Sequence, residues 1–354
     1  MRKEILKNMI NEKKRTNEVP MMYKWIADET WGKYGDKLKN ITKKYKDDFA
    51  IIDYLTNTYL KEKNVKKDEW GRVTKSSAVG SRTIEYPIKE WDDVPIYLKR
   101  FPDSKNPDRF KNFFTYWAHA QVFEEHPFKK VETEKVLREH EGEYIIGLVF
   151  PAINERLMGI IPADIYFSGF YTNQREIINL SDKLVEFDKG IIDGYSNLSV
   201  DGIWFSDDWG TQNNLMISPE LWRHFFRPRY ESLCEYTHNK GMQVWFHSCG
   251  NITKIIPDFI NIGVDVLHLG QPYVMDIDNI VKEYKDKICF FGGIDVQNKL
   301  LNSSPLGVQK HVEEILMTFK DSCFILSPTN SITPDVPLEN IASLFEVMKD
   351  RSGN

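Results

Sequence analysis

The segment Val244-Trp245-Phe246-His247-Ser248-Cys249-Gly250-Asn251-Ile252 joins a short apolar run to a nitrogen ligand, a sulfur ligand and a glycine turn. The run is typical of a buried strand, and it places His247 and Cys249 at the carboxyl end of that strand. In barrels and open parallel sheets this end carries the chemistry. A His-x-Cys pair suits zinc, although a His and a Cys in this position are structural about as often.

Seven further runs of the same kind occur along the chain, at residues 19–23, 49–54, 144–150, 202–206, 264–268, 288–291 and 323–327. Most are continuously apolar, as expected for strands that are covered on both faces. Helical sequence separates most of them. The clearest helix starts at the N-cap Ser218 and ends before Gly241, and Pro228 predicts a kink or break inside it. Eight alternations predict a (β/α)8 TIM barrel, with a doubly wound sheet as the alternative.

Residues 57–143 interrupt this alternation. Within them, residues 68–73 and 82–87 alternate between polar and apolar side chains and predict a small antiparallel hairpin. We interpret 57–143 as an excursion between barrel strands 2 and 3, within a single domain that spans 1–354. The chain contains no linker-like or repetitive segment that would divide it.

Composition narrows the classes of function. Hydrophobic residues make up 41% of the chain and charged residues 28%, and the net charge is −5 with no basic block. Nucleic acid is therefore not expected as a partner. No apolar run is long enough to span a membrane, and the chain starts without an apolar signal segment, so we expect a cytoplasmic protein with four reduced cysteines.

Polar side chains follow several of the predicted strands. Because the carboxyl ends of barrel strands meet at one mouth, they form a candidate site: Asp207, Asp208 and Trp209 after strand 4, His247 and Cys249 after strand 5, Gln271 after strand 6, Asp295 after strand 7 and Asn330 after strand 8. The two aspartates can equally be a solvated pair that caps a helix. If one is buried beside the other, its pKa rises and it becomes a candidate proton donor. His268, inside its strand, is interpreted as a core histidine.

Five stretches in this order resemble the uroporphyrinogen decarboxylase-like superfamily over nearly the whole chain: 68–71 (Asp-Glu-Trp-Gly), 207–212 (Asp-Asp-Trp-Gly-Thr-Gln), 247–252 (His-Ser-Cys-Gly-Asn-Ile), 291–297 (Phe-Gly-Gly-Ile-Asp-Val-Gln) and 335–341 (Asp-Val-Pro-Leu-Glu-Asn-Ile). The resemblance implies the barrel fold. Decarboxylases of the superfamily use no metal and bind carboxylates through arginines in an early motif. The matching segment here, 21–28, holds Lys24 but no arginine. Eight substrate carboxylates need bidentate cations, which argues against a porphyrinogen substrate.

The resemblance is closest to the other branch, methyltransferases that work with corrinoid proteins. Some of these hold zinc through His-x-Cys and a third ligand after the last strand, and His247 and Cys249 match that pair. At the third position this chain has Thr329-Asn330-Ser331, and an asparagine oxygen is a weak zinc ligand. Asp207, Asp208 or Glu155 can complete a mixed site instead.

The leading hypothesis is therefore a methyltransferase that moves a methyl group between a small donor or acceptor and a corrinoid (cobalamin) protein, assisted by zinc on His247 and Cys249. Asp207 and Asp208 are expected to complete the site or handle a proton. The expected substrate-orienting residues are Gln271, Asp295, Asn330 and Trp209, and aromatic rings near the mouth suit an aromatic ether or a quaternary amine. The alternatives are a metal-free uroporphyrinogen decarboxylase and a non-catalytic corrinoid or tetrapyrrole carrier.

Overall fold

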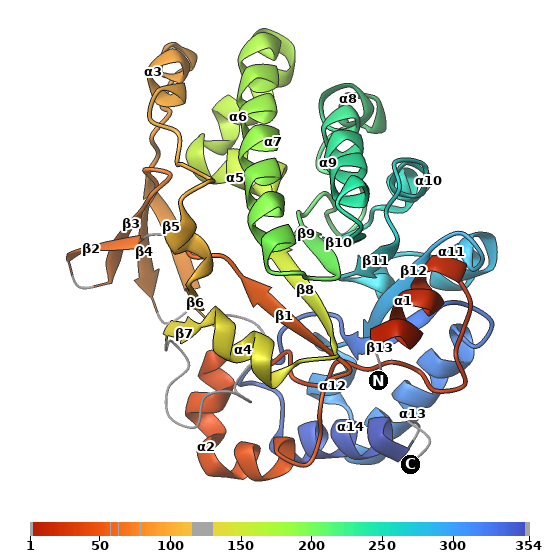
Figure 1. The fold of residues 1–354 in the computed structure, drawn as a ribbon. Coiled ribbons are helices and arrows are strands. Elements are labelled where there is room, and N and C mark those ends of the chain that lie inside the picture. The colour runs from red at the N-terminus through yellow and green to blue at the C-terminus, as the bar shows by residue number, and fades with distance from the viewer. Residues whose placement is uncertain (1–2, 57, 63, 78–79, 115–129, 351–354) are drawn as a thin grey trace.

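The computed structural model describes residues 3–56, 58–62, 64–77, 80–114 and 130–350. Its centre is a curled sheet of seven parallel strands in the order β1-β8-β9-β10-β11-β12-β13 (Figure 1). The strands are β1 (Phe49–Asp53), β8 (Tyr144–Val149), β9 (Gly202–Ser206), β10 (Gln243–Ser248), β11 (Val266–Leu269), β12 (Cys289–Ile294) and β13 (Phe324–Pro328). Each corresponds to a predicted strand, and the α/β barrel fold predicted from the sequence is confirmed.

The first predicted strand, 19–23, differs from the prediction. It forms only a bridge between Met21 and Leu326 of β13. The amide of Met22 donates to Leu326, and the amide of Asp48, just before β1, donates to Met21. Pro20 lacks an N–H, which limits how long a ladder the segment can make. The segment therefore connects the two ends of the sheet without becoming a regular strand.

Alternate side chains of the strands face opposite ways and build two apolar layers. The inner layer fills the barrel and includes Phe49, Tyr144, Trp245 and Phe291. Leu6, Met9 and Ile10 of helix α1 (Lys3–Glu12) belong to the same inner cluster. The outer layer packs against the surrounding helices. Because both faces are covered, the strands read as continuous apolar runs, as the sequence suggested.

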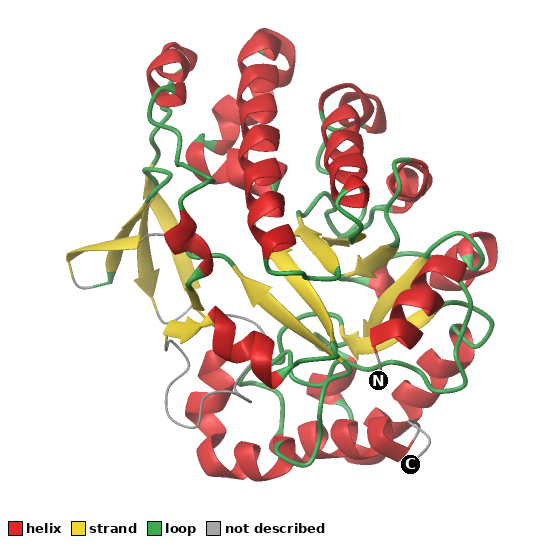
Figure 2. Cartoon of the chain, in the orientation of Figure 1, coloured by secondary structure: helices red, strands yellow, loops and turns green. Residues whose placement is uncertain are grey.

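Helices surround the sheet (Figure 2). They are α2 (Asp28–Thr42), α3 (Val94–Leu98), α4 (Thr133–Glu139), α5 (Ile153–Ile160), α6 (Ala163–Thr172), α7 (Gln174–Asn197), α8 (Pro219–Phe225), α9 (Arg227–Asn239), α10 (Ile256–Asn261), α11 (Ile277–Tyr284), α12 (Lys299–Asn302), α13 (Pro305–Thr318) and α14 (Leu338–Asp350). The break predicted at Pro228 is present, since Phe226 separates α8 from α9. Ser218 caps α8 by accepting from the amide of Leu221.

The excursion carries more structure than the predicted hairpin. It forms a four-stranded antiparallel sheet of β2 (Thr58–Glu62), β3 (Val65–Asp68), β4 (Val73–Ser77) and β5 (Gly80–Glu85), which lies to one side of the barrel (Figure 1). A second small sheet pairs β6 (Asn112–Phe114) with β7 (Lys130–Glu132). Four short 3-10 turns, at 91–93, 107–110, 253–255 and 272–274, complete the described elements. Among the described residues, no helix has the length and apolar character that a membrane span requires.

Candidate metal and active site

Three potential metal ligands meet at the carboxyl ends of β9 and β10. A carboxylate oxygen of Asp208, a ring nitrogen of His247 and the Sγ atom of Cys249 all lie within 4.8 Å of one another. The Nε2 atom of His247 is 3.4 Å from both Sγ of Cys249 and Oδ1 of Asp208. The structure thus brings together the two residues predicted as metal ligands and one of the two predicted aspartates.

Backbone contacts between the loop after β9 and the loop after β10 fix this arrangement. The amide of Cys249 donates to Oδ1 of Asp208 at 2.8 Å, and the amide of Gly210 donates to the carbonyl of Cys249 at 3.0 Å. A Cβ atom on Gly250, whose φ is +76°, would lie 2.1 Å from the carbonyl carbon of Gly210. The two glycines let the loops cross in contact, and this crossing holds Asp208 against the His-x-Cys turn.

The side chain of Asp207 points away from the cluster and toward helix α5. Its carboxylate accepts from the amides of Asn154 and Glu155, both at 2.7 Å, and from the hydroxyl of Tyr230. These amides belong to the first turn of α5, where a carboxylate satisfies donors that have no partner within the helix. Adjacent aspartates therefore have different surroundings: Asp207 holds α5 against β9, whereas Asp208 faces the cluster.

The charged groups of the cluster shift one another's pKa values. Burial acts to raise the pKa of Asp208, but the hydrogen bond and charge of His247 and the amide of Cys249 outweigh it, so the pKa is lowered. Burial acts to lower the pKa of His247, but the charge of Cys249 and the hydrogen bond to Asp208 raise it to about 10. In the absence of a metal, the site therefore favours a protonated His247 beside the carboxylate of Asp208. A divalent cation can take the place of that proton.

Two carboxyl groups beside the cluster are shifted toward the protonated form. Burial, together with the charges of Asp207 and Asp208, raises the pKa of Glu155 to about 8. Burial raises the pKa of Asp207 to about 7, against the lowering effect of the Tyr230 hydroxyl and the two amides. A neutral carboxyl group at neutral pH is a possible proton donor.

Two residues with small or neutral side chains shape the space around Cys249. The amide nitrogen Nδ2 of Asn330, after β13, lies 3.5 Å from Sγ and donates to it. Gly270 follows β11, and a Cβ atom there would lie 2.7 Å from Sγ of Cys249 and 2.9 Å from Cε1 of His247. The absence of a side chain at 270 therefore makes room for the sulfur and the imidazole. Sequence reasoning missed Gly270, because nothing local distinguishes it from a turn glycine.

The other predicted substrate-binding residues are held by partners outside the group of Asp208, His247 and Cys249. Gln271 sits between Gln212 and Gln297 in a chain of side-chain amide hydrogen bonds of 3.3 and 2.9 Å. Asp295 is buried and uses Oδ1 to accept from the amides of Gln297 and Asn298, both at 3.0 Å. Trp209 is 1% exposed. Its ring packs against Trp222, Phe226 and Tyr230 beneath α8 and α9.

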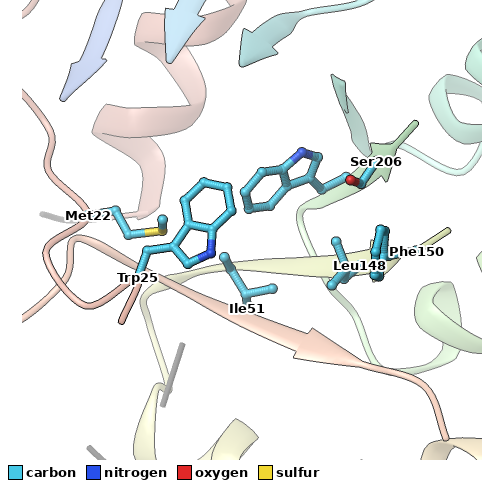
Figure 3. Close-up of a pocket in the computed structure, with 7 residues that line it drawn as sticks. Met22, Trp25, Ile51, Leu148, Phe150 and Ser206 are labelled. Carbon is cyan, nitrogen blue, oxygen red and sulfur yellow. The ribbon is translucent and has the colours of Figure 1, made fainter. Parts of the chain in front are cut away.

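A small apolar cavity lies near the cluster, and Figure 3 shows the side chains around it. Its volume is about 10 Å³, room for one water molecule, and its walls are Met22, Trp25, Ile51, Leu148, Phe150, Trp204 and Ser206. The rings of Trp25 and Trp204 lie 6.1 and 6.4 Å from the ring of His247. None of the seven lining residues is charged. The walls therefore favour a neutral group, but the side chains must move apart before a molecule larger than water can enter.

The histidine interpreted as a core residue contacts the site. Nδ1 of His268 lies 2.6 Å from Nδ1 of His247, and the two rings stack with centroids 4.8 Å apart. Burial and the neighbouring His247 hold the pKa of His268 well below its ordinary value. This contact was not anticipated from the sequence, because it depends on the register in which β10 and β11 pair His247 with His268.

Comparisons with known proteins agree with this fold. A family model described as uroporphyrinogen decarboxylase (URO-D) matches residues 165–351, the part of the chain that includes His247 and Cys249. Uroporphyrinogen decarboxylase of Hydrogenobaculum sp. (strain Y04AAS1) is 26% identical over 183 residues. The match covers 51% of this chain and spans half (50%) of the length of that relative.

A solved methyltransferase structure from Methanosarcina mazei has a TM-score of 0.65 with this structure at 13% sequence identity. The similarity covers 98% of this chain and 97% of that chain. At this level of identity it shows a shared barrel fold. The family model matches more than half of this chain, and the chain therefore belongs to the uroporphyrinogen decarboxylase (URO-D) family.

Proposed function

We propose that this protein transfers a methyl group between a small neutral molecule and a corrinoid protein, with zinc held by Asp208, His247 and Cys249. The observation that carries the proposal is the convergence of three different ligand atoms within 4.8 Å at the strand ends. One nitrogen, one sulfur and one oxygen ligand leave a fourth tetrahedral position open, as in catalytic rather than structural zinc sites. Bound zinc would polarise the heteroatom that gives up or accepts the methyl group.

The residues around the ligands support this chemistry. Asn330 donates to Sγ of Cys249 and so stabilises negative charge on the sulfur. The amide of Cys249 donates to Oδ1 of Asp208 and orients that carboxylate. Glu155, whose pKa is raised to about 8, would give a proton to a leaving group near neutral pH. Asp207 holds the first turn of α5, and hence Glu155, in place.

The apolar cavity is the place where the methyl-bearing molecule would bind once the surrounding side chains move apart. Trp25 and Trp204 line it and approach the ring of His247. Figure 3 shows Met22 and Trp25 on one side of the space and Leu148 and Phe150 on the other. Aromatic walls without a charged group favour a neutral ether or thioether over a carboxylate. The corrinoid protein would have to reach the same barrel mouth, where the ligands lie.

Decarboxylation of a porphyrinogen is the second candidate, because the matched family and the Hydrogenobaculum relative carry that name. The early segment that binds carboxylates in such enzymes offers only Lys24 here. Lys24 is buried, and burial lowers its pKa to about 8 although Asp47 acts to raise it. A buried lysine without an arginine partner is poorly suited to several carboxylates, so methyl transfer is the favoured function.

One anaerobic experiment separates the two reactions. Zinc-loaded protein is incubated with reduced cobalamin and a panel of methyl ethers, methyl thioethers and methylamines, and in parallel with uroporphyrinogen. We expect methylcobalamin from at least one donor and no loss of carboxyl groups from uroporphyrinogen. Cys249→Ala should abolish the transfer. The matched variant Cys234→Ala, at a buried cysteine of α9, should retain it. Decarboxylation that survives Cys249→Ala would instead assign the second function.

A further inference from the structure

His268 and His247 face each other across two neighbouring strands. They are paired in register on β11 and β10, and both point into the barrel with Trp245 and Val266 on the same face. Their Nδ1 atoms are 2.6 Å apart. Two imidazole nitrogens at this separation must share one proton, which one ring donates and the other accepts.

The direction of this hydrogen bond follows from the other nitrogen of His247. Nε2 of His247 is the atom that faces Asp208 and Cys249. A nitrogen that binds a metal must offer its lone pair, so the proton of a neutral His247 then lies on Nδ1. Nδ1 of His268 must accept that proton, which places the hydrogen of His268 on its own Nε2.

The surroundings of His268 hold its ring in one place. It is 1% exposed, and the rings of Phe291, Trp25 and Trp204 lie 4.5, 5.1 and 5.6 Å from it. A Cβ atom on Gly292 would come within 3.1 Å of its Cδ2 and Nε2 atoms. Nε2 is buried and makes no hydrogen bond of good geometry among the residues described, although the backbone carbonyl of Pro328 acts on the ring as an acceptor. The pair with His247 is thus the close hydrogen bond of this side chain, and an apolar cage disfavours a charged ring.

We propose that His268 is a positioning residue. Its Nδ1 accepts the Nδ1–H of His247, which fixes both the tautomer and the orientation in which Nε2 of His247 points toward Asp208 and Cys249. This inference rests on the proposed function, because it needs a metal on His247. Metal-binding histidines commonly require such an acceptor, and loss of the acceptor typically weakens metal affinity by about 10- to 100-fold.

The test measures zinc affinity of the full chain by competition with a chromophoric chelator. His268→Phe keeps a ring in the cage but removes the acceptor, and we expect it to weaken zinc binding by about 10- to 100-fold. His268→Asn restores an acceptor near the position of Nδ1 and should recover most of that loss. His140→Phe makes the same exchange at a buried histidine beside Glu143, remote from the site, and should bind zinc like the wild type. Equal affinity of His268→Phe and the wild type would overturn the inference.

A second readout reports the tautomer directly. In zinc-loaded protein labelled with ¹⁵N-histidine, NMR should show a proton on Nδ1 of His247 and an unprotonated Nδ1 on His268. The reverse assignment contradicts the inference even if His268→Phe fails to fold. If wild-type protein binds no zinc, the proposed function fails first. If the wild type binds zinc and His268→Asn is as weak as a folded His268→Phe, only the role of His268 is refuted.

Discussion

The side-chain amide of Asn330 lies 3.5 Å from the Sγ atom of Cys249. The loop after β13 thus approaches the cluster and presents an N–H donor to the sulfur. The third potential ligand atom comes from Asp208, in the loop after β9. If the cluster binds zinc, the oxygen ligand would come from a different strand end than Asn330.

Asn330→Cys should therefore strengthen zinc binding. A thiolate in place of the amide adds a sulfur ligand within reach of the site, and we expect affinity to rise by at least about tenfold, or about 1.4 kcal/mol. Asn330→Ala removes the donor without adding a ligand, and it should weaken binding modestly. Chelator competition on both variants checks this order of zinc affinities. Identical affinities for the cysteine and alanine variants would show that residue 330 does not face the metal.

Gly270→Ala should disrupt the cluster without touching a ligand. The added methyl group would lie 2.7 Å from Sγ of Cys249 and 2.9 Å from Cε1 of His247, closer than such atoms can approach. One of the two side chains must move, and we expect a loss of zinc affinity of tenfold or more. Gly32→Ala in α2 is the matched control, because a Cβ atom there meets nothing within 4 Å. If both alanine variants bind zinc normally, the site is looser than the structure indicates.

The two adjacent aspartates should separate stability from metal binding. Asp207→Ala leaves two amides of α5 and the hydroxyl of Tyr230 without their acceptor, which should lower the free energy of unfolding by about 3 kcal/mol or more. The side chain of Asp208 is 30% exposed, and Asp208→Ala should cost less stability but remove zinc binding. Urea unfolding and metal analysis of both variants measure the two effects. Equal losses of stability would contradict the division of roles.

Asp188 should make the stability of the protein depend on pH. It lies on α7 with Oδ2 buried and without a hydrogen-bond partner among the described residues, and burial raises its pKa to about 8 although Arg156 acts to lower it. The folded state therefore holds this proton more tightly than the unfolded state does. The contribution of Asp188 to the free energy of unfolding is fully present at pH below about 4. It declines by up to about 1.4 kcal/mol per pH unit as the pH rises to about 8.

Asp188→Asn removes this decline, so its melting temperature should exceed that of the wild type by a margin that grows from pH 5 to pH 8. Asp193, on the same helix, is the control with the opposite sign. Its ion pair with Lys240 and hydrogen bonds from Lys240 and Tyr236 outweigh burial and lower its pKa. Asp193→Asn should therefore destabilise the protein at pH 7, and less so as the pH falls toward the pKa. A margin for Asp188→Asn that does not vary with pH would refute the assignment.

The sequence revealed the strands that are buried on both faces, because their apolar runs are continuous. It also located His247, Cys249 and the aspartate pair, because all follow strands whose carboxyl ends meet. It could not decide between Asp207 and Asp208. Neighbouring residues at the end of a strand point in opposite directions, and only the crossing of Gly210 and Gly250 determines which one faces the cluster.

The roles of side chains after the later strands were harder to predict. Trp209 follows β9 as closely as Asp208 does, yet its ring packs beneath α8 and α9, whose positions depend on the break at Phe226. The contact between His247 and His268 depends on the register between β10 and β11, which single strands do not specify. Local pattern thus indicated where the site lies, while register and loop crossing decided its members.

Metal analysis of protein purified without chelator tests most directly whether Asp208, His247 and Cys249 bind one zinc ion. We predict close to one zinc per chain in the wild type and in Cys234→Ala, and a large loss in His247→Ala and Cys249→Ala. A wild-type protein that cannot be loaded with zinc, or a zinc content that His247→Ala leaves unchanged, would contradict the account.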